Sequence, residues 1–199
     1  MIALVAISIA FVACKKENKD DSGYVIEVKN VQNTSDGINY VEAQLTSKVL
    51  DDSKYANGAF KLNLPETVSN DLLKSGSSDG LFGWIDIVAL NKQKKTMGEF
   101  SYQDGNKNVR AHYAYANNDF KFEYTNEQGT APQIWNCSFV KGWNVIYAEE
   151  TENEMRISTT KPSGINLKWY FFSNTESKSQ NNTTNFIVGG SIIQNLMIK

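Results

Sequence analysis

Short runs of alternating apolar and polar residues, separated by Asn, Asp, Gly and Ser, recur along most of the chain. Alternation with a period of two predicts half-buried β-strands, because successive side chains of a strand point to opposite faces. We therefore expect an all-β fold, most simply an antiparallel β-sandwich, with a β-barrel or calycin-like meander as the alternative. The expected strands are residues 24–31, 40–45, 60–64, 83–90, 97–102, 109–115, 120–124, 134–140, 143–148, 155–159 and 166–172.

The connections between the last four of these runs are short. This favours antiparallel neighbours, since a parallel crossover needs about a dozen residues or more. Residues 66–74 are the one helical candidate, and we expect a short helix there that caps an end of the sheets. The strand 83–90 is the most apolar and is expected to be central. Asp86 interrupts one of its faces, and we favour a solvated edge for it over a buried site with partners.

The link at residues 140–142 sets the pairing of two aromatic-rich strands. A three-residue loop with Gly142 in a left-handed conformation places Phe139 opposite Trp143. A two-residue loop, which pairs Val140 with Trp143, is the alternative. We predict the three-residue loop, because it puts the large side chains of both strands on one face.

Residues 1–13 carry no charged side chain and are rich in Ala, Ile and Val, as in the apolar core of an export signal. The run is too short for a transmembrane helix, which needs roughly 20 apolar residues. Phe11-Val12-Ala13-Cys14 resembles the lipobox of bacterial lipoproteins. The resemblance implies a signal peptide at 1–13 and lipid attachment at Cys14, which would anchor the protein to a membrane. An ordinary cleaved signal with an incidental cysteine is the alternative.

After Cys14 the chain divides by composition. Residues 14–23 are polar and charged, and we expect a flexible tether. Residues 24–172 form a single domain, long enough to bury a sizeable core. Residues 173–199 begin as a low-complexity polar linker and end as an apolar tail, for which we expect a loosely held strand.

Several short stretches of the chain resemble elements of one group of lipoproteins. Their residues are Gly58, Phe60, Leu62, Leu64, Pro65, Lys141, Gly142, Trp143, Asn144, Pro162, Ser163, Gly164, Lys168, Trp169, Tyr170 and Phe171. The pattern resembles small all-β lipoproteins of Bacteroidota. In those proteins, acidic residues shortly after the cysteine accompany display on the cell surface, and Asp20 and Asp21 occupy such positions. The resemblance implies an outer-membrane lipoprotein at the cell surface, with the periplasmic face as the alternative. It implies no catalytic residue.

Charge and residue counts limit the chemistry. The net charge is −2 with both signs intermixed, so the chain has no electrostatic footprint for nucleic acid. With Cys14 acylated, Cys137 is the one remaining cysteine, and we expect it to be a buried apolar residue. As a nucleophile it would need a histidine, and His112 is the single one in the sequence. His112 shares a strand face with Arg110 and Ala114, which predicts a solvent-facing side.

Two acidic stretches have some features of metal sites. Asp104, Asn106 and Asn108 are spaced like the first ligands of a calcium loop. Val109 stands at the glycine position of such a loop and Tyr115 at its closing glutamate position, so we predict a hairpin turn. Residues 149–154 contain four glutamates, for which a solvated hairpin tip is favoured over a metal site. We predict no metal, no cofactor and no catalytic residue.

Two classes of function remain. A non-catalytic module would bind a glycan, a peptide or a partner protein. Aromatic residues make up 12% of the chain, and we expect roughly two or three of them to be exposed for this purpose. The alternative is a hydrolytic enzyme with an unrecognised carboxylate site. Exposed aromatics lining a groove would favour the first class, and two carboxylates converging in a deep pocket would favour the second.

Overall fold

The computed structural model describes residues 23–127 and 131–174, which form fourteen strands and one 3-10 turn, η1 (Asn70–Leu72). The strands are β1 (Val25–Val28), β2 (Tyr40–Leu45), β3 (Lys48–Lys54), β4 (Phe60–Asn63), β5 (Ser75–Ser77), β6 (Gly80–Trp84), β7 (Asp86–Leu90), β8 (Thr96–Asp104), β9 (Val109–Ala116), β10 (Phe120–Asn126), β11 (Gln133–Phe139), β12 (Gly142–Glu150), β13 (Met155–Ser158) and β14 (Lys168–Ser173). The prediction of an all-β fold is confirmed.

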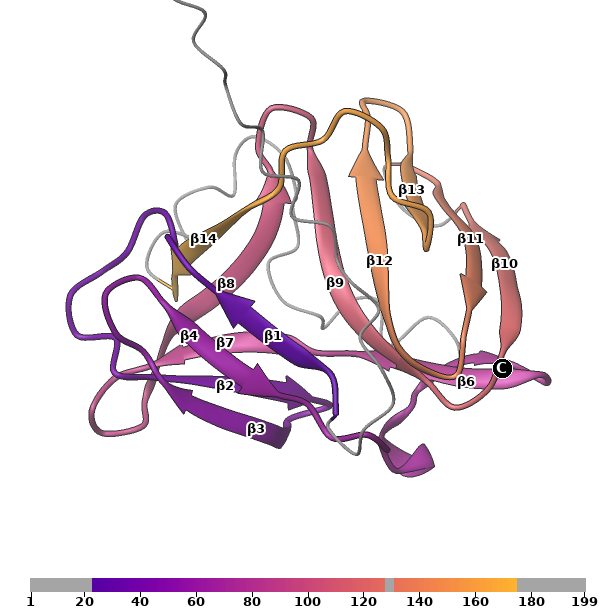
Figure 1. Cartoon of the computed structure of the whole chain (residues 1–199). Helices are drawn as coiled ribbons and strands as arrows, with labels where there is room; N and C mark the ends of the chain where they lie inside the picture. The colour runs from indigo at the N-terminus through magenta and orange to yellow at the C-terminus, as the bar shows by residue number, and fades with distance from the viewer. Residues whose placement is uncertain (1–22, 128–130, 175–199) are drawn as a thin grey trace, which may run out of the picture.

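Twelve of these strands form one large, open sheet, and β1 and β4 form a separate two-stranded sheet. The main path of the large sheet runs β10-β11-β13-β12-β9-β8-β7-β2-β3, with β14 added on β8, β6 on β9 and β5 on β6 (Figure 1). Its two ends do not meet, so the barrel alternative is wrong and a sandwich-like arrangement remains.

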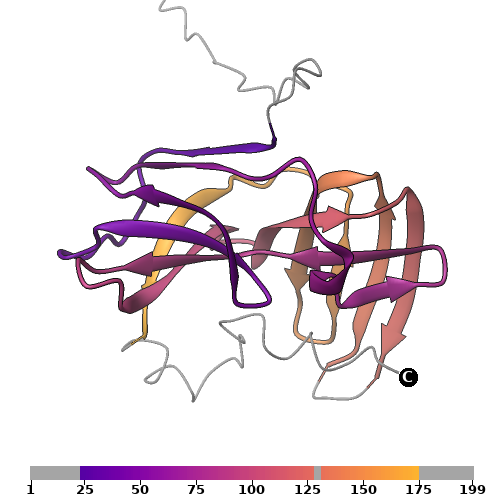
Figure 2. The same ribbon diagram turned by 90° about the horizontal axis from the view of Figure 1, so that it is seen from below.

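The large sheet has two halves, which differ in how they are arranged (Figures 1 and 2). In the first, which we call the two-layer half, β1 and β4 cover β2, β3, β7, β8 and β14. In the second, the curled half, β6 and β9 to β13 bend around their own side chains. One hydrophobic cluster fills each half.

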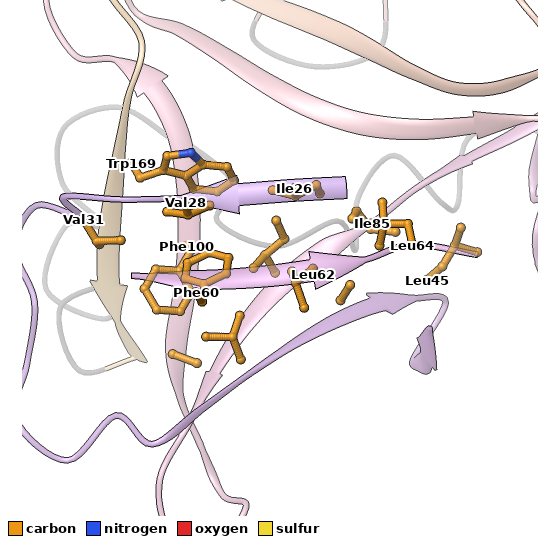
Figure 3. Packing of buried hydrophobic residues seen from close by; sticks show 14 of the residues in the cluster. Ile26, Val28, Val31, Leu45, Phe60, Leu62, Leu64, Ile85, Phe100 and Trp169 are labelled. Carbon is orange, nitrogen blue, oxygen red and sulfur yellow. The ribbon is translucent and has the colours of Figure 1, made fainter. Parts of the chain in front are cut away.

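The core of the two-layer half lies between the two sheets. Residues of β4 alternate, so that Phe60 and Leu62 are buried while their neighbours are exposed. Ile26 and Val28 of β1 also point inward, and Phe60 meets Phe100 of β8 with ring centroids 5.0 Å apart (Figure 3). Each such burial contributes about 1.5–3 kcal/mol. Together they hold the small sheet on the large one.

The core of the curled half is aromatic, and Phe82 of β6 is its centre. This side chain is fully buried, and it lies 4.5 to 6.4 Å, between ring centroids, from the rings of Trp84, Phe120, Phe122, Trp135 and Phe139. Three strands, β9, β12 and β13, separate β6 from β11 along the sheet. Contact between side chains that far apart in strand order requires the sheet to curl.

The hairpin of β8 and β9 opens into a fork. The two strands pair only near their turn, residues 102–104 with 109–111. Beyond this point β9 pairs with β6 and β8 pairs with β7. Ile85, between β6 and β7, donates its N–H to the carbonyl of Tyr113 at 3.0 Å. The predicted central strand 83–90 is thus two strands, each bound to a different arm of the fork.

A second fork lies between β11 and β12, and it overturns both predicted registers. The short β13 inserts between them, antiparallel to β12 and parallel to β11. Phe139 pairs with Phe120, and Trp143 pairs with Tyr115, so neither strand faces the other as expected. Gly142 does have a positive φ of 102°. The expectation of antiparallel neighbours therefore fails at the β11–β13 pair, although the connections are short.

Two further expectations need correction. The helical candidate at 66–74 yields only η1, because Ser69 makes no side-chain capping bond and the turn buries no residue. The edge strand β3 was not expected, since its sequence KVLDDSK is charged and lacks a regular apolar face. Asp51 of β3 accepts a hydrogen bond from the backbone N–H of Asn63 at 2.6 Å and so ties the edge to β4.

Candidate functional site

The expected exposed aromatics are absent from residues 23–127 and 131–174. The exposed large apolar side chains there are Val25, Val49 and Val140, and every described Phe, Tyr and Trp is at least half-buried. Partly exposed tyrosines do lie on the convex face, where Tyr102 and Tyr147 flank Ala111 in register. Tyr102 is part of an aromatic cluster, since it stacks on Trp169 with ring centroids 4.9 Å apart.

The concave face of the curled half changes from apolar to polar along its strands. Pairing places Phe120 and Phe139 in one row near the turns drawn at the bottom of Figure 1. At the other end a row across four strands contains Asn126, Gln133, Met155 and Glu150. A row just below it runs Tyr124, Trp135, Ile157, Ala148 and Arg110. We call Arg110, Asn126, Gln133 and Glu150 the polar end.

Arg110 and Glu150 dominate the electrostatics of the polar end. Burial lowers the pKa of Arg110, and the negative charges of Glu150 and Glu99 oppose this shift. Burial raises the pKa of Glu150, and Arg110 opposes that shift in turn. The two groups are therefore charged partners in a poorly solvated place. Within the described part of the chain, the buried Oε2 of Glu150 accepts no hydrogen bond.

His112 lies one row below Arg110, and the prediction of a solvent-facing side for it is wrong. It pairs opposite Ile146, and Ala114 on the same face is fully buried. Burial, with a smaller effect of Arg110, lowers the pKa of His112 to about 4. The side chain nevertheless keeps partial solvent contact. His112 is thus a neutral imidazole at neutral pH, between the aromatic core and the charged groups.

Two carboxylates, Asp86 and Glu99, lie next to this region on the same face of the sheet. Glu99 pairs opposite Val88, two residues after Asp86 on β7. Burial raises the pKa of Glu99, the charge of Asp86 raises it further, and Arg110 lowers it. Asp86 is half-buried and interacts with its surroundings, so the solvated edge predicted for it does not describe its position.

The remaining candidate residues have structural roles. Cys137 is buried as predicted, and its thiol donates to the carbonyl of Ile157 at 3.7 Å. Burial raises the pKa of Cys137 to about 12, which removes the thiolate that a nucleophile needs. Asp104 accepts the backbone N–H of Asn106 at 3.0 Å and that of Asn166 at 2.7 Å. It fixes the β8–β9 turn, which confirms the predicted hairpin.

The acidic stretch at 149–154 is not one cluster. Glu150 turns to the concave face and Glu149 to the opposite one, while Glu154 forms an ion pair with Arg156. A solvated tip was predicted, and for Glu150 this prediction is wrong. The described residues contain no group of three or more His, Cys, Asp or Glu side chains that could hold a metal ion.

Sequence reasoning missed the polar end because its members come from four strands. Arg110, Asn126, Gln133 and Glu150 are spread over forty residues of sequence. Pairing of β9 with β12 joins Arg110 to Glu150, pairing of β10 with β11 joins Asn126 to Gln133, and the inserted β13 links the two pairs. The proposed lipid-attachment residue, Cys14, lies outside the described residues. In residues 23–127 and 131–174, no helix is long and apolar enough to cross a membrane. No protein family, curated protein or solved structure gives a significant match to the chain.

Proposed function

We propose that this protein is a lipid-anchored envelope protein whose β-domain is a non-catalytic binding module. Cys14 would carry the anchor, in the outer membrane and at the cell surface, or on its periplasmic side. The domain would bind a glycan, a peptide or a partner protein. The polar end of the curled half is the ligand site that the geometry supports best.

One observation carries this proposal. Hydrogen-bonding groups of different kinds converge at the polar end beside half-exposed apolar surface from Tyr124 and Met155. Ligand sites commonly combine an apolar lining with a few placed polar groups. The buried acceptor on Glu150 adds specificity, because a ligand that lacks a donor there leaves it unsatisfied.

A fluorescence titration tests the site. Trp135 is adjacent to Tyr124 in the sheet and lies 6.4 Å from Trp84, between ring centroids, so its emission should report binding at the polar end. The full chain would be titrated with glycans, peptides and outer-membrane extracts. We expect Arg110→Gln to weaken binding about tenfold or more. Arg156→Gln, an exposed control on β13, should leave binding unchanged. Equal effects of the two substitutions would contradict the proposed site.

The anchor is tested separately. Cys14→Ala should move the protein from the detergent phase to the aqueous phase on phase separation, because the attached acyl chains are lost. The melting temperature should not change, since the substituted residue precedes the proposed domain at residues 24–172. Partitioning that is identical in the two proteins would reject the lipoprotein assignment.

A second candidate function is a hydrolase that uses Asp86 and Glu99. The observation in its favour is that Glu99 has a raised pKa beside a second carboxylate, as a general acid requires. A broad screen with glycoside and ester substrates tests this function. Turnover by the purified protein that disappears in Glu99→Gln and persists in Glu123→Gln, an exposed glutamate of β10, would establish the enzyme and reject the non-catalytic module.

A further inference from the structure

The feature that identifies a ligand class is the carboxylate of Glu150. Its Oε2 is buried, and no described donor reaches it. A buried carboxylate oxygen without a donor is unfavourable, because water no longer solvates its charge. A hydrogen bond from a ligand to this oxygen would therefore contribute more binding free energy than the same hydrogen bond to an exposed carboxylate.

The surroundings of Glu150 select the kind of donor. The Arg110 guanidinium is close enough to affect the pKa of Glu150, and it would repel an ammonium group placed beside it. A neutral hydroxyl meets no such repulsion. Two adjacent hydroxyls suit the pair well, since one can donate to Glu150 while the oxygen of the other accepts from Arg110. His112, which is neutral at neutral pH, adds no further positive charge.

The rest of the row extends the site. Met155 lies directly opposite Glu150, and Gln133 and Asn126 follow on the next two strands. With strands about 4.8 Å apart, the row from β12 to β10 spans on the order of 14 Å. Met155 and Tyr124 provide apolar surface for the C–H face of a ring, and the partly exposed amide of Gln133 can both donate and accept. Asn126 is buried and closes the row.

We propose that the polar end binds a neutral carbohydrate, with a pair of vicinal hydroxyls of one sugar held by Glu150 and Arg110 and further sugars lying across β13, β11 and β10. This inference rests on the function proposed above and narrows its ligand to one class. It does not require a catalytic step.

Calorimetric titration of the full chain tests the proposal. The probes are neutral trisaccharides (cellotriose, maltotriose, xylotriose and mannotriose), a tetrapeptide without charged side chains, and spermidine as a cation. We expect at least one trisaccharide to bind and spermidine not to bind. Glu150→Gln should lower the affinity for the trisaccharide about tenfold or more, because the acceptor loses its charge. Glu149→Gln, a change on the adjacent residue that faces the other side, is the matched control and should bind as the unmodified protein does.

A second measurement does not depend on a variant that folds. Deoxy analogues of the bound sugar, each lacking one hydroxyl, should identify two adjacent positions whose loss costs the most affinity. Three results would each overturn the carbohydrate proposal. The first is that no trisaccharide binds, and the second is that Glu150→Gln binds with the same affinity as the unmodified protein. The third is that removal of any hydroxyl lowers the affinity by a similar amount. Binding of the peptide or spermidine that Glu150→Gln abolishes would also overturn it, while leaving the binding module intact. If neither these probes nor outer-membrane extracts bind, both proposals fail.

Discussion

The two halves of the large sheet bury opposite faces. In the two-layer half, Ile87 and Phe100 face the cover formed by β1 and β4, whereas in the curled half Phe82 and Trp135 lie on the other side of the sheet. The exchange takes place where β8 and β9 separate. Side chains in this region are partly buried, and charged residues such as Glu99 are found among them. A sheet that changes its buried face thus creates a half-buried polar region without a loop.

The two cores also differ in composition, for a geometric reason. A separate layer brings its own side chains to the sheet, so residues as small as Val28 and Val41 fill the two-layer half. Among the residues that the structure describes, no second layer covers the curled half, and its interior is filled from one side. Large rings such as Phe82 and Phe139, stacked with centroids 4.5 Å apart, reach across the concave space.

The largest expected effect comes from removing the centre of the curled half. Phe82→Ala should lower the free energy of unfolding by about 3–5 kcal/mol, because it leaves a cavity among five rings. Leu62→Ala, at a fully buried site of the other core, is the comparison and should lower the free energy of unfolding by about 2–5 kcal/mol. Denaturant titration followed by fluorescence and circular dichroism measures both. A single transition in each variant shows that the halves unfold together, and separate transitions would show two independent units.

Acid should destabilise the curled half through His112. Its folded pKa of about 4 lies below the ordinary 6.5, so the unfolded chain takes up the proton first. The stabilising contribution is complete above pH 6.5 and is lost as the pH falls toward 4, by up to about 3 kcal/mol. The raised pKa values of Glu99 and Glu150 act in the opposite direction and offset part of this loss. His112→Gln should flatten the dependence of stability on pH between 6.5 and 4. An unchanged profile would mean that the imidazole is not buried.

The smallest effect concerns the two-layer half. The hydroxyl of Tyr55 is buried without a hydrogen-bond partner among the described residues, and burial raises its pKa. The ring stacks on Phe100 with centroids 5.5 Å apart. Tyr55→Phe keeps that contact and removes the unsatisfied group, so we expect stability to rise by about 1 kcal/mol. Thermal melts of the two proteins measure this, and a lower melting temperature in the variant would contradict it.

The sequence predicts what depends on local alternation. In β2, Val41, Ala43 and Leu45 share the buried face as their spacing indicates, and the runs that became β9 and β10 are close to their expected bounds. Pairing between strands was not predictable in the same way. No local signal shows that four residues, 155–158, insert between β11 and β12.

The candidate site was missed for the same reason. A strand pattern such as Arg110-Ala111-His112 shows that side chains alternate between two faces, but it does not show which face is buried. The charged residues suggested that their face is the solvent side. The sheet overrides that indication because it curls, and the curl follows from contacts between distant strands such as those of Phe82. Glu150 and Arg110 are forty residues apart in the sequence, and this spacing does not indicate that they lie close together.

The forked hairpins bear on how the chain reaches this arrangement. If β11 and β12 closed along their whole length, they would occupy the backbone groups that β13 needs, so a complete hairpin is a kinetic trap. Asn144 holds the loop between the two strands. Its side chain accepts the N–H of Val140 at 3.0 Å and donates to the carbonyl of Val140 at 2.7 Å, which engages the backbone at the base of the fork. Folding that depends on these late insertions between distant strands should be slow, as it is for other chains rich in non-local pairing. In that interval the unpaired edges of β11 and β12 are open to other chains.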